Sequence, residues 1–157
     1  MVKNNSNVVQ LVSQQLLKIA KLFSRLLAML FLFLTVAAHA GDLVITVENI
    51  KSEQGNIRAE IFNNPKDFTK TPYLAQLIAA KSGTVSFTFK GVPTGQYAVS
   101  AFHDINGNEK LDTNFVGKPV EPYGFSRDAR GTFGPPSFEE ATIEVDEAVK
   151  TVKIFVK

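Results

Sequence analysis

The sequence predicts an all-β protein, an antiparallel β-sandwich of the immunoglobulin-like or transthyretin-like kind. Short stretches in which apolar and polar residues alternate recur from residue 42 to the end of the chain. Turn-forming stretches rich in Gly, Pro, Asn and Asp separate them. The chain has 13 phenylalanines and no cysteine, and all but three of the phenylalanines fall in this part. The domain therefore folds on its own apolar core, without disulfides.

The first 40 residues have the pattern of a secretory signal peptide. Basic residues come first, namely Lys3, Lys18, Lys21 and Arg25. An uncharged apolar run follows over residues 26–38, shorter than the ~20 residues that a helix needs to cross a bilayer. Small residues in "AHA" precede Gly41, so we expect cleavage after Ala40 and a single sandwich domain over residues 41–157. An uncleaved N-terminal anchor is the alternative.

A signal peptide places the protein in the periplasm or outside the cell. Removal of the leader leaves 13 basic and 15 acidic residues, a net charge of −2, although the whole chain carries +2. A domain without a basic stripe is not expected to bind nucleic acid. We expect no transmembrane span after cleavage and no lipid anchor at the mature terminus. We expect its partner, of unknown identity, in the cell envelope or outside the cell.

The alternation places the elements in order. Residues 42–50 and 57–62 are expected to form two strands of a hairpin, and residues 74–81 a short helix. Residues 96–104 are apolar on both faces, which predicts a strand in the centre of a sheet. The remaining strands are expected at residues 83–92, 139–147 and 149–157.

Residues 104–138 lack this alternation and form one long loop region. It contains Tyr123, Phe125, Phe133 and Phe138, and a disordered segment seldom carries so many aromatic residues. We therefore expect the region to be ordered and to pack against the sandwich, with a short strand near residues 113–117. Long ordered loops in small domains are commonly functional.

The motifs "GQYAV", "HDING", "LDTNF", "YGFS" and "GPPSF" occur in this order, and the chain resembles the bacterial family called domain of unknown function 2141. The resemblance covers nearly all of residues 41–157. It implies an exported bacterial β-sandwich and assigns no activity. Glu109 departs from the family pattern, which more usually has Gly at that place.

The segment "DINGNEKLD" has the spacing of a calcium loop. Alternate side chains of Asp104, Asn106, Asn108 and Asp112 supply hard oxygen atoms, and Lys110 would contribute its backbone carbonyl. Calcium would then stabilise the loop weakly, with a dissociation constant of ~10⁻⁴–10⁻³ M. The ligand set would be completed from elsewhere, for which the candidates are Glu121 and Asp128.

The same segment is also a tight turn rich in Asx residues. Asn106-Gly107 is a strong turn signal, and Asn and Asp side chains bond their own backbone in turns. A helix-loop-helix calcium site would have Gly at the sixth position and Glu at the twelfth, where this chain has Glu109 and Phe115. The sequence leaves calcium binding and a simple turn as alternatives.

Two further sets of polar residues are candidates for function. A periplasmic hydrolase would use His103, Asp104, Glu121 and Ser126, with Asp112 nearby, but the sequence lacks a nucleophile elbow. Alternatively, Tyr123, Phe125, Arg127 and Arg130 form a ligand- or partner-binding surface within residues 121–138. We expect a non-catalytic exported module, with the hydrolase as the alternative. A structural envelope protein is a third possibility.

Overall fold

The computed structural model describes residues 3–32 and 39–157. The chain divides into two compact units, Met1–Ala38 and His39–Lys157. In the first unit, helix α1 extends over Lys3–Leu32. The end of the predicted apolar run, residues 33–38, lies outside the described residues. Among the described residues, no helix combines the length and the apolar character that a membrane span requires.

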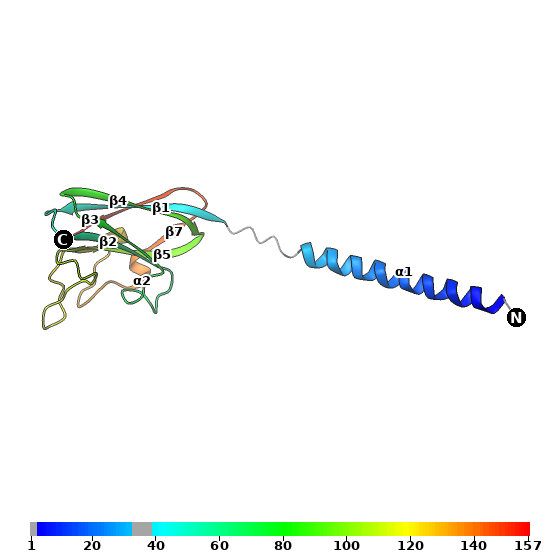
Figure 1. Ribbon diagram of the computed structural model, residues 1–157. Coiled ribbons are helices and arrows are strands. Elements are labelled where there is room, and N and C mark those ends of the chain that lie inside the picture. The colour runs from blue at the N-terminus through cyan, green and yellow to red at the C-terminus, as the bar shows by residue number, and fades with distance from the viewer. Residues whose placement is uncertain (1–2, 33–38) are drawn as a thin grey trace. The chain divides into compact units, whose positions relative to one another are not determined.

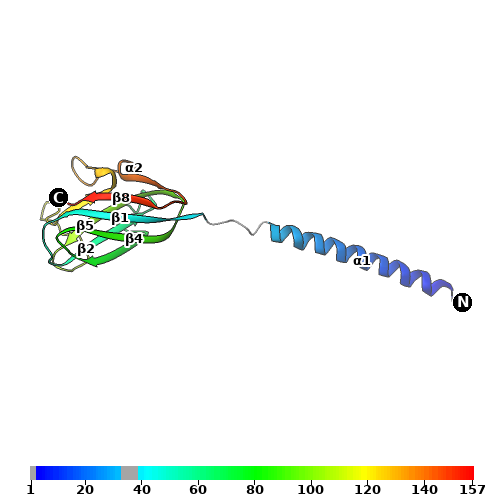
Figure 2. The same cartoon turned by 90° about the horizontal axis from the view of Figure 1, so that it is seen from above.

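The second unit contains two sheets (Figures 1 and 2). The smaller sheet has the order β4-β1-β8, and the larger has the order β3-β2-β5-β6, with β7 also paired to β5. The strands are β1 (Ala40–Ile50), β2 (Asn56–Phe62), β3 (Leu74–Ala79), β4 (Gly83–Pro93), β5 (Gly95–Asp104), β6 (Tyr123–Phe125), β7 (Thr142–Val145) and β8 (Lys150–Phe155). A short 3-10 helix, η1 (Ser126–Asp128), and helix α2 (Phe138–Ala141) lie between β6 and β7. The predicted all-β, sandwich-like architecture is confirmed.

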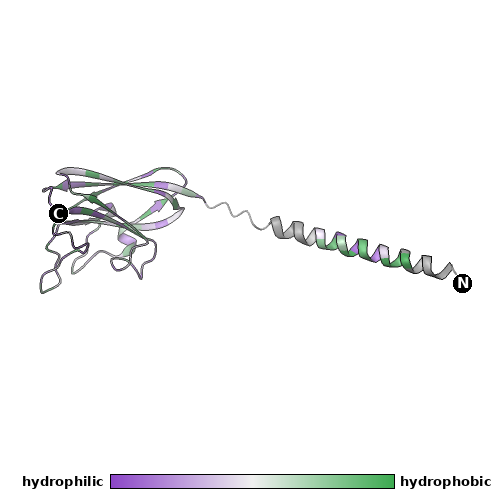
Figure 3. Cartoon of the chain, viewed as in Figure 1, coloured by the Kyte–Doolittle hydropathy of each residue, from purple (hydrophilic) through white to green (hydrophobic). Residues whose placement is uncertain are grey.

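The core lies between the two sheets and is mainly aliphatic, with Phe87, Phe89 and Tyr97 as its aromatic members. Inward-facing residues of β1, β2, β4, β5 and β8 form one buried cluster, in which Ile45, Ile61 and Ile154 are fully buried. Hydrophilic residues alternate with them along the strands (Figure 3). Every buried hydrophobic side chain among the described residues belongs to the second unit. The unit therefore carries a complete core and folds on its own.

The predicted pairing of the first two strands is wrong. β1 pairs with β4 and with β8, whereas β2 pairs with β3 and β5 in the other sheet. Both strands alternate in the same way because both face the common core. Alternation shows which face is buried, and it does not show whether two strands lie side by side or opposite one another.

Two further expectations are corrected. Residues 74–81, expected to be helical, contain strand β3, which pairs with β2 over its whole length. So short a segment is marginal as a helix, and pairing with β2 satisfies its backbone groups. The sandwich is also not purely antiparallel, because β1 and β8 run parallel from Leu43↔Lys150 to Glu48↔Phe155. The expectation that residues 96–104 form a central strand is confirmed by β5, which lies between β2 and β6.

The outer face of the larger sheet carries the irregular segments (Figure 1). Three rows of residues cross β2 and β5 on this face: Phe62↔Ala98, Glu60↔Ser100 and Arg58↔Phe102. The rows of Ser100 and Phe102 continue to Phe125 and Tyr123 of β6. One end of the face is covered by a second buried cluster, which contains Phe62, Phe68, Ala98, Phe125, Ala129, Phe138 and Ala141. The other end is the floor of the candidate site.

Candidate functional site

The loop of residues 105–122 is anchored by Asp104 at the end of β5. The Asp104 side chain is fully buried, and its carboxylate accepts three backbone hydrogen bonds. Oδ1 accepts from Gly107 N at 2.8 Å and from Asn108 N at 3.1 Å, and Oδ2 accepts from Glu109 N at 2.8 Å. A buried carboxylate requires such donors, and here the donors are the amides of the turn that follows it.

A second buried carboxylate, Glu121, closes the same loop from its other end. Its Oε1 accepts from Ile105 N at 2.8 Å, and its Oε2 accepts from Asp112 N at 3.0 Å. Only 7% of the residue is exposed. Two carboxylates thus bond five backbone N–H groups and hold a segment that has little regular structure. The short strand expected near residues 113–117 is reduced to one bridge, Thr113↔Pro119.

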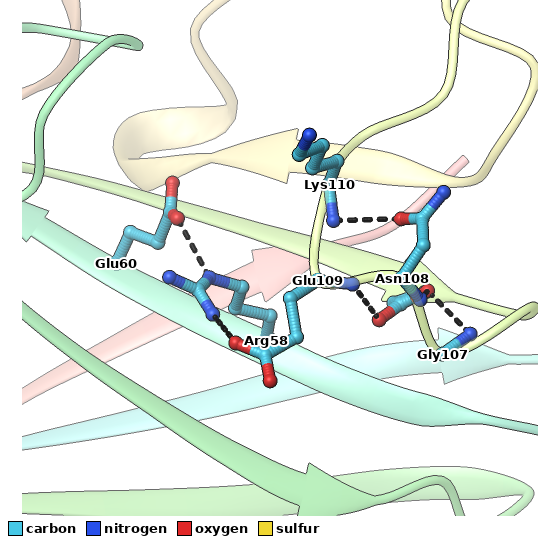
Figure 4. Close-up of polar contacts among 7 residues, drawn as sticks. Arg58, Glu60, Gly107, Asn108, Glu109 and Lys110 are labelled. Atoms are coloured by element: carbon cyan, nitrogen blue, oxygen red, sulfur yellow. Dashed lines mark hydrogen bonds and ion pairs between the residues drawn. The ribbon is translucent and has the colours of Figure 1, made fainter.

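Glu109 adopts the backbone conformation that its position in the turn requires. Its φ is +61°, in the left-handed region that glycine occupies most easily. Its carboxylate accepts a hydrogen bond from Arg58 Nη1 at 2.9 Å, while Arg58 Nε donates to Glu60 at 2.8 Å (Figure 4). Burial acts to lower the pKa of Arg58, but Glu60 and Glu109 outweigh it and raise the pKa. The ion pair between Arg58 and Glu109 therefore connects the turn to β2.

The predicted calcium ligands lie together, and their side chains bond one another and the backbone of the loop. Asn106 and Asn108 donate from Nδ2 to the two Asp112 carboxylate oxygens, at 2.6 and 3.0 Å. Their own side-chain oxygens accept from the backbone N–H groups of Asn108 and Lys110. The described residues contain no group of three or more His, Cys, Asp or Glu side chains arranged to hold a metal.

The two carboxylates suggested to complete the calcium site are engaged elsewhere. Glu121 bonds two backbone amides, as described above. Asp128 accepts from Arg130 Nη2 at 2.8 Å, and Lys157 Nζ lies 3.5 Å from its other oxygen. The hydrogen bond from Arg130 is the main cause that lowers the pKa of Asp128.

The residues of the hydrolase alternative do not form one site. The Ser126 side chain is fully buried, and its hydroxyl donates to Ala141 O at 2.5 Å and accepts from Val99 N at 3.0 Å. The His103 ring donates from Nε2 to Gln54 O at 2.7 Å. Val99 and His103 are four residues apart on β5, about 13 Å along a strand. Ser126 therefore ties β5 to α2, and it does not meet His103.

A cleft of about 710 Å³ lies over the open end of the outer face. Its floor includes Glu60, Ser100, Phe102 and Tyr123, which come from the cross-strand rows. The loop of residues 105–122 and the segment 131–135 supply the walls. Its size is in the range of about 300–1,000 Å³ that is typical of small-molecule sites.

The predicted binding residues separate into two groups. Tyr123 and Phe125 line the cleft. Arg127 lines a different depression of about 440 Å³, next to Phe138 and Glu139, and Arg130 pairs with Asp128. The expected single surface of aromatic and arginine side chains is therefore divided.

The sequence interpretation missed Glu60, Ser100 and Lys118 as site residues. Ser100 Oγ donates to Glu60 Oε2 at 3.3 Å on the cleft floor. The alternation of β2 predicts that Glu60 points away from the core, and this is a usable signal. The position of Lys118 depends on the path of the loop, and no local pattern predicts that path.

The chain belongs to the family described as "Uncharacterized protein conserved in bacteria", domain of unknown function 2141. The family model matches residues 45–153, which begin within β1 and end within β8 and include every strand between them. The resemblance predicted from the sequence motifs is thus confirmed. No curated protein and no solved structure matches the chain.

Proposed function

We propose that this protein is an exported, non-catalytic binding module that takes a small molecule into the cleft above β2, β5 and β6. The cleft itself carries this proposal. It is open to solvent along its rim, its floor combines the polar side chains of Glu60 and Ser100 with aromatic ones, and the two buried carboxylates fix one of its walls. Binding sites combine an apolar lining with a few well-placed polar groups in the same way.

Export is proposed from the leader. Basic residues, an apolar run and small residues before Gly41 are the three parts of a signal peptide. The boundary between the two compact units at Ala38 and His39, and the start of β1 at Ala40, are compatible with cleavage there. The exported protein would then take its ligand from the periplasm or the medium. It would also meet an envelope partner in that compartment. N-terminal sequencing of the exported protein tests this, and we expect Gly41 as the first residue.

Two finer points are proposals as well. We assign the sandwich to the immunoglobulin-like or transthyretin-like class, which has short strands in two packed sheets. We also propose weak Ca²⁺ binding at residues 104–112. Asp104 is buried and already accepts three N–H groups, so the half-buried Asp112 would be the main remaining carboxylate ligand. The affinity is therefore expected at the weak end, about 10⁻³ M.

An NMR titration of the unit His39–Lys157 tests the proposed cleft. Backbone amide shifts are recorded with benzoate, benzamide and benzylamine, which share a ring and differ in charge. We expect the shifted amides to cluster at Ser100, Lys118 and Gly124, with those of Lys81 and Lys90 unchanged. Shifts that are absent with all three compounds, or that are scattered over both sheets, would overturn the proposal.

A further inference from the structure

We propose that the ligand of the cleft is an amphipathic organic anion, an apolar body that carries one carboxylate, sulfonate or phosphate group. The inference rests on the proposed function of the cleft and adds the chemical class of its ligand. Three features support it: the charge balance of the lining, lysine side chains that lack acidic partners, and exposed apolar side chains on both walls.

The charge balance of the cleft is opposite to that of the domain. Three lysines line it, Lys70, Lys110 and Lys118, together with two acids, Glu60 and Glu109. Arg58 forms ion pairs with both acids, at 2.8 and 2.9 Å. With Arg58 included, the cleft has an excess of two positive charges, whereas residues 41–157 carry a net charge of −2. A local excess of this kind favours an anionic ligand.

The lysine side chains are free to bind it. Within the described part of the chain, Lys110 and Lys118 form no ion pair, and they bond the loop through their backbone N–H groups to Asn108 and Asn114. In Figure 4 the contact drawn for Lys110 starts from its backbone nitrogen, and its ammonium group has none. Lys70 Nζ donates to the backbone carbonyl of Lys66 at 3.5 Å, a weak contact. Each ammonium has three donors for an acid group.

The same cleft presents exposed apolar surface on both walls. Val116 of the first wall is 68% exposed, and Phe133 of the second is fully exposed. Leu111, Pro119 and Pro135 extend these walls, above Tyr123 and Phe125. Apolar side chains exposed on opposing walls of one depression indicate a surface that a partner covers. A ligand with an apolar body would cover them while its acid group reaches the lysines.

A cationic ligand fits the cleft less well. Arg58 already holds both carboxylates of the lining, so a ligand cation would compete with it and would face three lysines. A neutral, fully polar ligand would leave Val116 and Phe133 exposed. The anion with an apolar body is the class that uses both properties of the lining.

Two fluorescent probes test the proposal on the unit His39–Lys157. Anilinonaphthalenesulfonate and phenylnaphthylamine share the same aromatic frame, and only the first carries a sulfonate. We expect the sulfonate to bind more tightly, and we expect the double variant Lys110→Gln/Lys118→Gln to weaken it about three- to tenfold. The affinity for the neutral probe should change by less than about twofold, because charges at the rim act on an anionic ligand and not on a neutral one. The matched control Lys81→Gln/Lys90→Gln removes two exposed lysines of the β4 region.

The outcomes separate this inference from the proposed function. A sulfonate preference that is lost in the Lys110/Lys118 variant and kept in the Lys81/Lys90 variant supports the anionic ligand. If both probes shift the cleft amides and bind equally well to all three proteins, the anion proposal is overturned while the cleft remains a binding site. If neither probe shifts the amides of Ser100 and Gly124, both proposals fail.

Discussion

The two ends of the outer face of the larger sheet are built from the same strands but are covered differently. At one end, Phe62 of β2 and Ala98 of β5 are covered by Phe68 and Phe138 from the flanking segments. At the other end, Glu60 of β2 and Ser100 and Phe102 of β5 remain under an open cleft. The first end is sealed by aromatic rings, and the second is enclosed by a loop that carboxylates hold in place.

This difference explains how one face serves stability and binding together. Ring centroids of Phe68 lie 5.3 Å from Phe62, 5.7 Å from Phe125 and 5.8 Å from Phe138. Such packing excludes water from between the rings. Asp104 and Glu121 order the loop of residues 105–122 by bonding its backbone, so this loop does not depend on the packing of its side chains. The loop can therefore be fixed while the cleft beneath it stays open.

The largest effect is expected at the sealed end. Phe68→Ala removes the ring at the centre of the aromatic cluster and should lower the free energy of unfolding by about 3–5 kcal/mol, because a buried cavity replaces it. Urea denaturation of the unit His39–Lys157 measures the loss. The control is Phe115→Ala, whose side chain is 99% exposed and which should change stability by less than about 0.5 kcal/mol. Equal losses of unfolding free energy in the two variants would show that the aromatic cluster does not stabilise the fold more than the exposed loop does.

A smaller effect is expected from the wall of the cleft. Asp104→Ala removes the acceptor of three backbone N–H groups and should cost about 2–3 kcal/mol of unfolding free energy. The donors lie on exposed residues and can turn to water, which limits the cost. Asp112→Ala, which removes contacts to two surface amides, should cost about 1 kcal/mol or less. If Asp112→Ala lowered the free energy of unfolding more than Asp104→Ala in metal-free solution, the buried Asp104 carboxylate would not be the anchor of the loop.

Glu109 allows a test of the turn itself. The variants Glu109→Gly and Glu109→Ala both lose the contact with Arg58, but only glycine relieves the positive φ of +61°. We expect the glycine variant to be more stable than the alanine variant by about 1 kcal/mol. Thermal unfolding of both proteins measures the difference. An alanine variant of equal stability would mean that the left-handed conformation is not required at this position.

The smallest effect is expected from calcium. With a dissociation constant of about 10⁻³ M, an equal concentration of Ca²⁺ stabilises the fold by about 0.4 kcal/mol, a shift of about 1–2 °C in Tm. The shift should disappear in Asp112→Ala. A shift of zero at ~10 mM, a concentration well above the dissociation constant expected for such a loop, would leave residues 104–112 as an Asx-rich turn.

Much of the fold follows from hydrophobic patterning: alternation identified most of the strands, and the apolar residues on both faces of residues 96–104 indicated the central position of β5. It did not reveal that β1 and β2 belong to different sheets, because both present the same pattern to one core. The Asx-rich turn was recognised from Asn106-Gly107, and its anchor Asp104 was among the named residues. The cleft could not be predicted, because its floor comes from Glu60 of β2, residues 100–102 of β5 and residues 123–125 of β6, and their meeting depends on strand order.

The most direct test of the account fills the cleft. Thr113 is exposed and lines the first wall, so Thr113→Trp should occupy the cleft without disturbing the core, and Thr88→Trp on β4 is the matched control. The affinity for the neutral probe phenylnaphthylamine is measured for both. We expect the Thr113 variant to lose binding and the Thr88 variant to keep it. Unchanged binding by a folded Thr113 variant would contradict the assignment of the cleft as the functional site.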